Sequence, residues 1–209
     1  MSYALRTRAP KRTMLDSELA AVLKVSGEHR DGFRDHVIIS LAVGTALREH
    51  EIAALDLGDV TVDRRRVLRT FHLRVFKGSR HWRDIDPARL AELQTIRLPD
   101  ATFYKLEKYI RTLPPPRRLD RPLFLSERKQ RISARRLRAM WRTWQQRAGL
   151  AVPYTFHELR HTAISLYRER TGDIRLTQIF ARHADLNTTT IYDHPREQEL
   201  VDRVRRQPG

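Results

Sequence analysis

Apolar residues recur at helical spacing along most of this chain, and that periodicity constrains its fold more than any other feature. Residues three and four apart share a face on a helix, whereas alternate residues share a face on a strand. The helical pattern covers segments 15–23, 33–42, 52–55, 103–113, 137–148, 157–170 and 174–181. Residues 67–76 (VLRTFHLRVF) alternate as a strand does, and Thr95–Leu98 is expected to return as a second strand. The pattern predicts a mainly helical chain with a small β-sheet.

Glycine, proline and capping residues indicate where several of these helices begin and end. Gly27 and Gly44 are expected to end the first two helices. Ser133 is expected to cap a long helix that Gly149 stops, because serine accepts from free N–H groups and glycine tolerates a left-handed turn. An aspartate followed by proline predicts a short helix over 87–94.

The length of 209 residues fits one domain with short extensions. We expect a basic, flexible arm over 1–12, a single globular domain over 13–194, and a charged tail over 195–209. Cysteine is absent, which excludes disulfides, thiolate metal sites and cysteine nucleophiles. No apolar run approaches the roughly 20 residues of a membrane span, and the first residues lack the apolar stretch of a secretory signal. The expected location is the cytoplasm.

Positive charge is the strongest compositional feature. Lysine and arginine number 41 against 25 acidic residues, so the net charge is +16. Residues 111–147 hold twelve of the basic residues and two acidic ones. Such a surplus attracts polyanions and favours nucleic acid as the partner, although a solvated basic face or a membrane-surface patch has the same composition.

Tryptophans lie within this basic stretch. Trp141 and Trp144 share one face with Leu137, Met140 and Ala148. They could stack on bases, but their helical spacing with aliphatic neighbours favours core packing.

Chemistry-bearing residues are densest between 157 and 192. The segment His157–His161 (HELRH) matches the H-E-x-x-H pattern of zinc hydrolases. Arg160 opposes that interpretation, because it projects near the face shared by the two histidines and would repel a dication. His183 lies at none of the usual distances for a third zinc ligand.

The same residues also fit a phosphate site. Arg160 supplies a permanent cation, and His157 and His183 are donors or proton carriers. A phosphodiester needs its non-bridging oxygens neutralised as the transition state builds charge, which paired arginines do by bidentate hydrogen bonding. Such a site requires a second arginine and a nucleophile.

Three separate segments resemble the catalytic boxes of tyrosine recombinases, the phage integrase family. Gly44–Leu55 (GTALREHEIAAL) resembles the first box, and His157–His161 resembles the H-x-x-R-H box. Ala181–His183, followed nine residues later by Tyr192, resembles the third, and 188–194 (TTTIYDH) fits it closely. The resemblance implies a mainly α fold with a small antiparallel β-sheet (α+β), with 13–194 as the catalytic domain.

The resemblance also implies the reaction. Arg48 and Arg160 would clamp the scissile phosphate, and Tyr192 would attack it to leave a 3′-phosphotyrosine and a free 5′-hydroxyl. His183 would bind a phosphate oxygen or assist the nucleophile. A free tyrosine has a pKa near 10, so we expect the surrounding positive groups to favour its phenolate.

Further residues receive supporting roles from the resemblance. His157 would be the proton carrier of the second box, and Glu51 would hold Arg48 or His157 in place. His161 would support these residues from behind. Lys77, between the strand-like segment and Gly78, would be the general acid on the family's hairpin, although residues 79–94 enlarge the loop after it.

The chain departs from the family at the third box, where Ala181-Arg182 replaces the usual Leu-Gly. We expect Arg182 to add a phosphate contact. The other residues expected to contact DNA come from the basic stretch and are Arg131, Arg135, Arg136, Arg138 and Arg142.

The sequence thus predicts a site-specific DNA recombinase with no metal or cofactor. Its expected partners are double-stranded DNA and three further copies of itself, assembled on that DNA, with the tail over 195–209 as a candidate docking helix; whether accessory DNA-bending proteins take part is left open. The alternatives are a type IB-like topoisomerase of the same fold and a zinc-dependent hydrolase.

Overall fold

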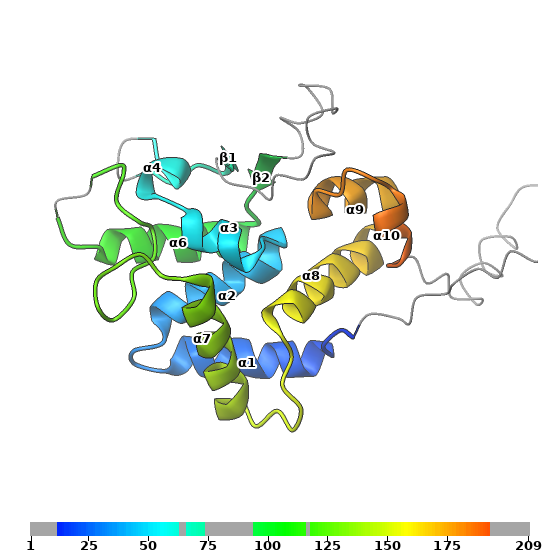
Figure 1. Cartoon of the computed structure of the whole chain (residues 1–209), viewed down its shortest axis with the longest axis horizontal. Coiled ribbons are helices and arrows are strands. Elements are labelled where there is room, and N and C mark those ends of the chain that lie inside the picture. Colours follow the sequence, from blue (N-terminus) through cyan, green and yellow to red (C-terminus); the bar gives the residue numbers. More distant parts are fainter. Residues whose placement is uncertain (1–11, 63–65, 74–93, 116–117, 193–209) are drawn as a thin grey trace, which may run out of the picture.

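A computed structural model describes residues 12–62, 66–73, 94–115 and 118–192. Within these ranges the chain is mainly helical, with one small sheet (Figure 1). The elements are α1 (Asp16–Glu28), α2 (Phe33–Thr45), α3 (Glu49–Ala54), α4 (Leu57–Val60), β1 (Thr70–His72), β2 (Thr95–Arg97), α6 (Asp100–Thr112), α7 (Ala134–Arg147), α8 (Phe156–Thr171), α9 (Ile174–Ala181) and α10 (Asn187–Thr190).

Helix α2 forms the centre of the molecule, packed against α1, α6 and α8 (Figure 1). Its consecutive residues 37–39 are fully buried, as are Leu41 and Ala42. A helix that is apolar on every side is stable only when other elements surround it. This central position explains why the second segment lacks a polar face.

Strands β1 and β2 pair antiparallel, with Phe71 opposite Ile96. Both of these side chains are buried, while their neighbours along each strand are more exposed. The antiparallel sheet confirms the predicted fold class, although β1 is shorter than the strand expected over 67–76. The predicted helix over 87–94, the arm, the tail and Lys77 lie essentially outside the described residues, so the domain boundaries stay a prediction.

Two glycines were wrongly predicted to end helices. Gly27 lies within α1, and a Cβ there would come 3.2 Å from the ring of His36 on α2. Gly44 lies within α2, and a Cβ there would come 2.6 Å from the hydroxyl oxygen of Thr102 on α6. Both glycines allow helices to approach closely, which is a tertiary requirement that the local sequence does not reveal.

The predicted ends of α7 are confirmed. The Ser133 hydroxyl accepts from the backbone N–H of Arg136 at 3.2 Å, and Gly149 follows the helix with φ at +74°. Trp141 and Trp144 are 1% and 3% exposed, which confirms core packing over base stacking. Across the described part of the chain, no helix combines the length and apolar character needed to cross a membrane.

Candidate active site

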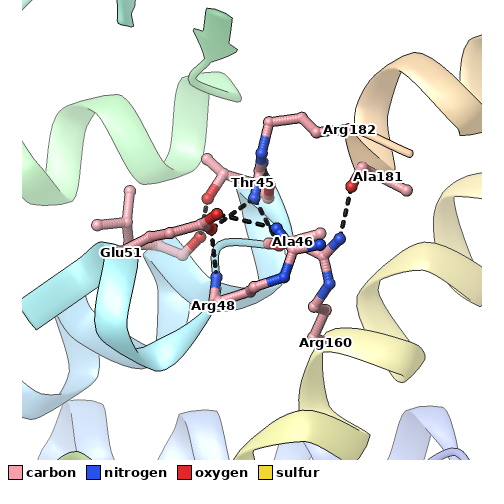
Figure 2. A network of polar contacts seen from close by, with 8 residues as sticks. Thr45, Ala46, Arg48, Glu51, Arg160, Ala181 and Arg182 are labelled. Carbon is pink, nitrogen blue, oxygen red and sulfur yellow. Dashed lines mark hydrogen bonds and ion pairs between the residues drawn. The ribbon is translucent and has the colours of Figure 1, made fainter. Parts of the chain in front are cut away.

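Three segments that are distant in sequence meet beside α8. They are the loop from Thr45 to Arg48 that joins α2 to α3, the C-terminal end of α9, and the short α10. Figure 2 shows the guanidinium groups of Arg48, Arg182 and, from α8, Arg160 gathered around Ala46 and Glu51. The predicted first, second and third boxes therefore form one site.

Arg160 holds the segments together from within α8. Its side chain is buried and donates to the backbone oxygens of Ala46 and Ala181 (Figure 2). Burial, followed by the charges of Arg48 and Arg182, holds the pKa of Arg160 well below its usual value. Forming this site therefore costs free energy unless negative charge arrives to offset the cations.

Glu51 is the carboxylate that these cations share. Its Oε1 accepts from Arg48 Nη1 at 2.9 Å, and its Oε2 accepts from the Arg48 backbone N–H at 2.7 Å and from Arg182 Nη2 at 2.8 Å. Burial raises the pKa of Glu51, but Arg182, Arg48 and Arg160 outweigh it, so the net shift is downward. The expected contact of Glu51 with Arg48 is present.

The site carries more positive than negative charge. Arg48, Arg160 and Arg182 surround Glu51, and both Arg160 and Arg182 are 3% exposed. Three guanidinium groups against one carboxylate leave an excess of two positive charges. Because like charges in a buried site repel one another strongly, the arrangement favours a bound anion. The Arg48 side chain is 26% exposed, so an anion can reach this arginine from solvent.

Tyr192 follows α10 and packs into this site. Its side chain is 6% exposed, and its hydroxyl contacts Nδ1 of His161. Burial raises the pKa of Tyr192 to about 12, although Arg160 and Arg48 act in the opposite direction. The surrounding cations favour the phenolate, as expected, but desolvation outweighs their attraction, so the net shift of the Tyr192 pKa is upward.

The three candidate histidines differ in exposure. His183 is buried, and its Nδ1 lies 2.9 Å from the hydroxyl of Thr189 on α10. His161 was expected behind the site, but it contacts the tyrosine directly. His157 is exposed, with its ring edge-on to His161 and the centroids 4.4 Å apart. His157, His161 and Tyr192 thus form a row that leads from solvent into the site.

Arg182 lies within the site and not on the surface. Its guanidinium is buried and donates to the backbone oxygens of Thr45 and Ala46 as well as to Glu51. The phosphate contact expected of Arg182 stays a prediction, and the bonds that the structure shows direct its guanidinium inward to the first box. Backbone carbonyls such as that of Ala46 were missed at the sequence level, and no side-chain pattern could have revealed them.

Comparison with known proteins agrees with this geometry. The model of the phage integrase family matches residues 12–199. The chain belongs to the phage integrase family. It is 32% identical to the tyrosine recombinase XerC of Shewanella oneidensis, over 88% of this chain and 54% of that protein. It is 27% identical to the tyrosine recombinase XerA of Pyrococcus furiosus, over 97% of this chain and 66% of that protein.

Solved structures have the same fold. A crystal structure of XerA recombinase matches with a TM-score of 0.70 at 22% identity, over 100% of this chain and 68% of that one. The Tn1549 transposon integrase in complex with circular intermediate DNA matches with a TM-score of 0.71 at 16% identity, over 96% of this chain and 68% of that one. This chain spans about half the length of the XerC relatives that it matches.

The zinc interpretation of the second family box conflicts with the contacts of its residues. Glu158 accepts from the backbone N–H of Thr155 at 2.6 Å and so caps α8. His161 directs Nδ1 to Tyr192. Within the described ranges no group of three or more histidine, aspartate or glutamate side chains could hold a metal ion. Family membership explains the HELRH segment without a metal.

The arginines expected to contact DNA are exposed on and beside α7. Arg131 also bonds to the backbone oxygens at the end of α3 and to Asp56. Arg136 and Arg138 form ion pairs with Glu127 and Glu49. The remaining two, Arg135 and Arg142, form no ion pair with any residue that the structure describes.

Proposed function

We propose that this protein is a site-specific DNA recombinase that cleaves and rejoins strands through a 3′-phosphotyrosine intermediate. The observation that carries the proposal is the meeting of Arg48, Arg160 and Tyr192 in one site with excess positive charge. A phosphodiester is the anion that a tyrosine nucleophile requires there. Membership of the phage integrase family supports the same reaction.

In the proposed reaction, Arg48 and Arg160 bind the non-bridging oxygens of the scissile phosphate. The Tyr192 oxygen attacks phosphorus, the bond to the 5′ oxygen breaks, and a 3′-phosphotyrosine forms. A 5′-hydroxyl of another strand then attacks the phosphotyrosine. The bond to Tyr192 breaks and a new phosphodiester forms, so no external energy source is needed.

Two protons move in this cycle. The Tyr192 hydroxyl contacts His161, so an imidazole is in place to take the phenol proton when the attack begins. His183 binds a phosphate oxygen, and His157 carries protons between the site and solvent. Lys77 protonates the leaving 5′ oxygen, as a lysine ammonium with an available proton can do.

The direct test replaces the nucleophile. Tyr192→Phe removes one hydroxyl, so covalent protein–DNA adducts on a nicked suicide duplex should disappear while DNA binding is retained. Tyr109→Phe is a matched control, because the Tyr109 hydroxyl is also buried but bonds to the Leu123 carbonyl outside the site. Adducts that persist on a denaturing gel with Tyr192→Phe would rule out this nucleophile. Relaxation of supercoiled DNA without strand exchange would instead identify a topoisomerase.

The proposed partners are double-stranded DNA and further copies of the chain. The proposed location is the cytoplasm of the host cell, where the DNA lies. Exchange of strands between two duplexes requires four cleavages, so four subunits must gather on the DNA. An apolar groove of about 710 Å³ between α1, α2, α6, α8 and α9 is a candidate contact surface. The tail contains Leu200, Val201 and Val204 at helical spacing, which suits such a groove.

Deletion of residues 196–209 tests this assembly. If the tail of one subunit binds the groove of its neighbour, deletion should reduce recombination far more than single-site cleavage. Sedimentation should find a monomer without DNA, because a charge of +16 opposes self-association. Full recombination by the deletion variant, or a stable tetramer without DNA, would contradict the proposal.

A further inference from the structure

Arg182 lies at an unusual point of the backbone. It follows α9 with φ at +55°, a left-handed conformation that side-chain-bearing residues rarely adopt, at a position where the family usually has glycine. Its guanidinium is also buried, which removes a charge from water. Both features disfavour arginine, but its side chain makes contacts that glycine cannot make.

Those contacts all reach the first catalytic box. Arg182 donates through Nη1 to the Thr45 oxygen at 2.9 Å, and through Nη2 to the Ala46 oxygen at 3.1 Å and to Glu51 Oε2 at 2.8 Å. Ala46 is itself left-handed, with φ at +49°, and directly precedes the turn that carries Arg48. Arg182 thus fixes the conformation of this loop from the opposite side of the site.

Two of the acceptors are shared with the phosphate-binding arginines. The Ala46 oxygen accepts from both Arg182 and Arg160. Glu51 binds Arg182 through one oxygen and the Arg48 guanidinium through the other (Figure 2). The two oxygens of a carboxylate are rigidly joined. The bond from Arg182 to one oxygen of Glu51 therefore also fixes the direction in which the other oxygen faces Arg48. A change at Arg182 therefore reaches Arg48 and Arg160 together.

We propose that Arg182 is a positioning residue that locks Arg48 and Arg160 into one phosphate clamp through Glu51 and the Ala46 carbonyl. The proposal rests on the proposed recombinase function. It assigns a positioning role to an arginine that occupies the place of the family's usual glycine. Arg182 does not touch the DNA. It holds the groups that do, and a displacement of about 1 Å in such groups is enough to slow a reaction on the order of 100-fold.

Arg182→Gly is the principal variant, because glycine is the family residue and relieves the left-handed backbone. We expect single-turnover adduct formation to slow on the order of 100-fold at saturating DNA, with little change in the DNA concentration that half-saturates the rate. Arg182→Lys keeps the charge but loses the fork geometry, so it should recover part of the rate.

The pH profile separates positioning from mere structural support. Arg182 is the largest of the attractive charges that keep Glu51 ionised, and without it the pKa of Glu51 rises. The acidic limb of the cleavage profile should therefore move to higher pH in Arg182→Gly and return toward its original place in Arg182→Lys. Arg34→Ala is the control, because Arg34, like Arg182, pairs with a carboxylate and donates to a backbone carbonyl distant in sequence, but it does so outside the site. It should leave the acidic limb unmoved.

A double-mutant cycle tests whether the effect passes through Glu51. If it does, Arg182→Gly should cost much less in the Glu51→Gln background than in the wild type. Lys129→Gly controls for backbone strain, since Lys129 is exposed with φ at +56°. Both glycine substitutions relieve a left-handed backbone, but only Arg182→Gly should lower the unfolding temperature, because it removes buried bonds.

Wild-type cleavage and an unmoved acidic limb in Arg182→Gly would overturn the inference while leaving the recombinase proposal intact. If Arg182→Gly does not fold, Arg182→Lys decides in its place, and a wild-type rate would overturn the inference. A wild-type chain that forms no adduct, or adducts in Tyr192→Phe, would overturn the proposed function and the inference with it.

Discussion

Arg160 binds backbone oxygens on two different segments and still has donors left for a ligand. A guanidinium has five N–H groups, and the carbonyls of Ala46 and Ala181 need two of them. One side chain can thus hold the site together and bind phosphate. Loss of Arg160 would therefore mix a structural effect with a catalytic one.

Arg48 offers a cleaner test of the clamp, because its side chain bonds to Glu51 and no described segment depends on it as a bridge. Arg48→Ala should lose about 3 kcal/mol of transition-state stabilisation, as removal of a single oxyanion donor does. Arg48→Lys should recover only part of it, since an ammonium cannot bind in a bidentate way. Single-turnover cleavage beside DNA titration measures both quantities. A fully active Arg48→Ala would exclude Arg48 from the clamp.

Two buried tyrosines should make the free energy of unfolding depend on pH in alkali. Burial raises the pKa of Tyr192 and of Tyr109 to about 12, whereas an unfolded tyrosine titrates near 10. Between these pH values the folded chain keeps both protons and the unfolded chain releases them. The free energy of unfolding should therefore fall as pH rises from about 10 to about 12.

Phenylalanine variants measured by denaturant unfolding across this pH range isolate each contribution. Tyr109→Phe and Tyr192→Phe should each make the slope of unfolding free energy against pH less steep, by the contribution of up to one proton. Neither variant should change the pH dependence below about 9. An unchanged slope in Tyr192→Phe would show that its phenol already titrates normally in the folded chain.

At the scale of the element, α8 is the helix on which the site depends. It carries His157, Arg160 and His161, and it begins with a reciprocal cap between Thr155 and Glu158. The Thr155 hydroxyl accepts from the Glu158 N–H at 3.1 Å, and the Glu158 carboxylate accepts from the Thr155 N–H at 2.6 Å. The cap thus fixes the first turn, where His157 lies.

Thr155→Ala should lower the free energy of unfolding by about 1 kcal/mol, because it leaves the N–H of Glu158 without its side-chain acceptor. Ser133→Ala, which removes the equivalent acceptor at the start of α7, is the matched comparison and should cost a similar amount. Both are measured by denaturant unfolding at neutral pH. No loss in either variant would mean that water replaces the caps.

The ends of the helices show what the sequence could and could not predict. Ser133 and Gly149 act through neighbouring residues, so their roles were visible locally. Gly27 and Gly44 act through His36 and Thr102 on other helices, and no pattern within α1 or α2 points to those partners.

The candidate site shows the same division between local and distant effects. The structure brings together Arg48, Arg160, His183 and Tyr192, which the motif spacing had grouped. The direction of Arg182 and the pKa of Tyr192 depend instead on burial, which arises only when distant segments pack together.

For the whole molecule, binding to DNA should depend steeply on salt, because each cation that neutralises a phosphate releases a counterion. The plot of log affinity against log salt should have its slope reduced by about 0.9 for each phosphate contact removed. Arg135 and Arg142 on α7 are exposed without ion pairs among the described residues, so Arg135→Ala and Arg142→Ala should each reduce the slope by about that amount. Arg118→Ala is a control, since Arg118 pairs with Asp120. Unchanged slopes would place the DNA elsewhere.

The long reach of the bonds around Ala46 has a consequence for a chain that is still being translated. The backbone oxygens of residues 45 and 46 accept from Arg160 and Arg182, which lie 114 to 137 positions later in the chain. The proposed nucleophile, Tyr192, follows both arginines. Contacts of such separation form late, because they must close long loops. A growing chain has already exposed its basic α7 when it lacks both the second arginine and the tyrosine. We therefore expect ribosome-bound or prematurely terminated chains to adhere to DNA without the ability to nick it.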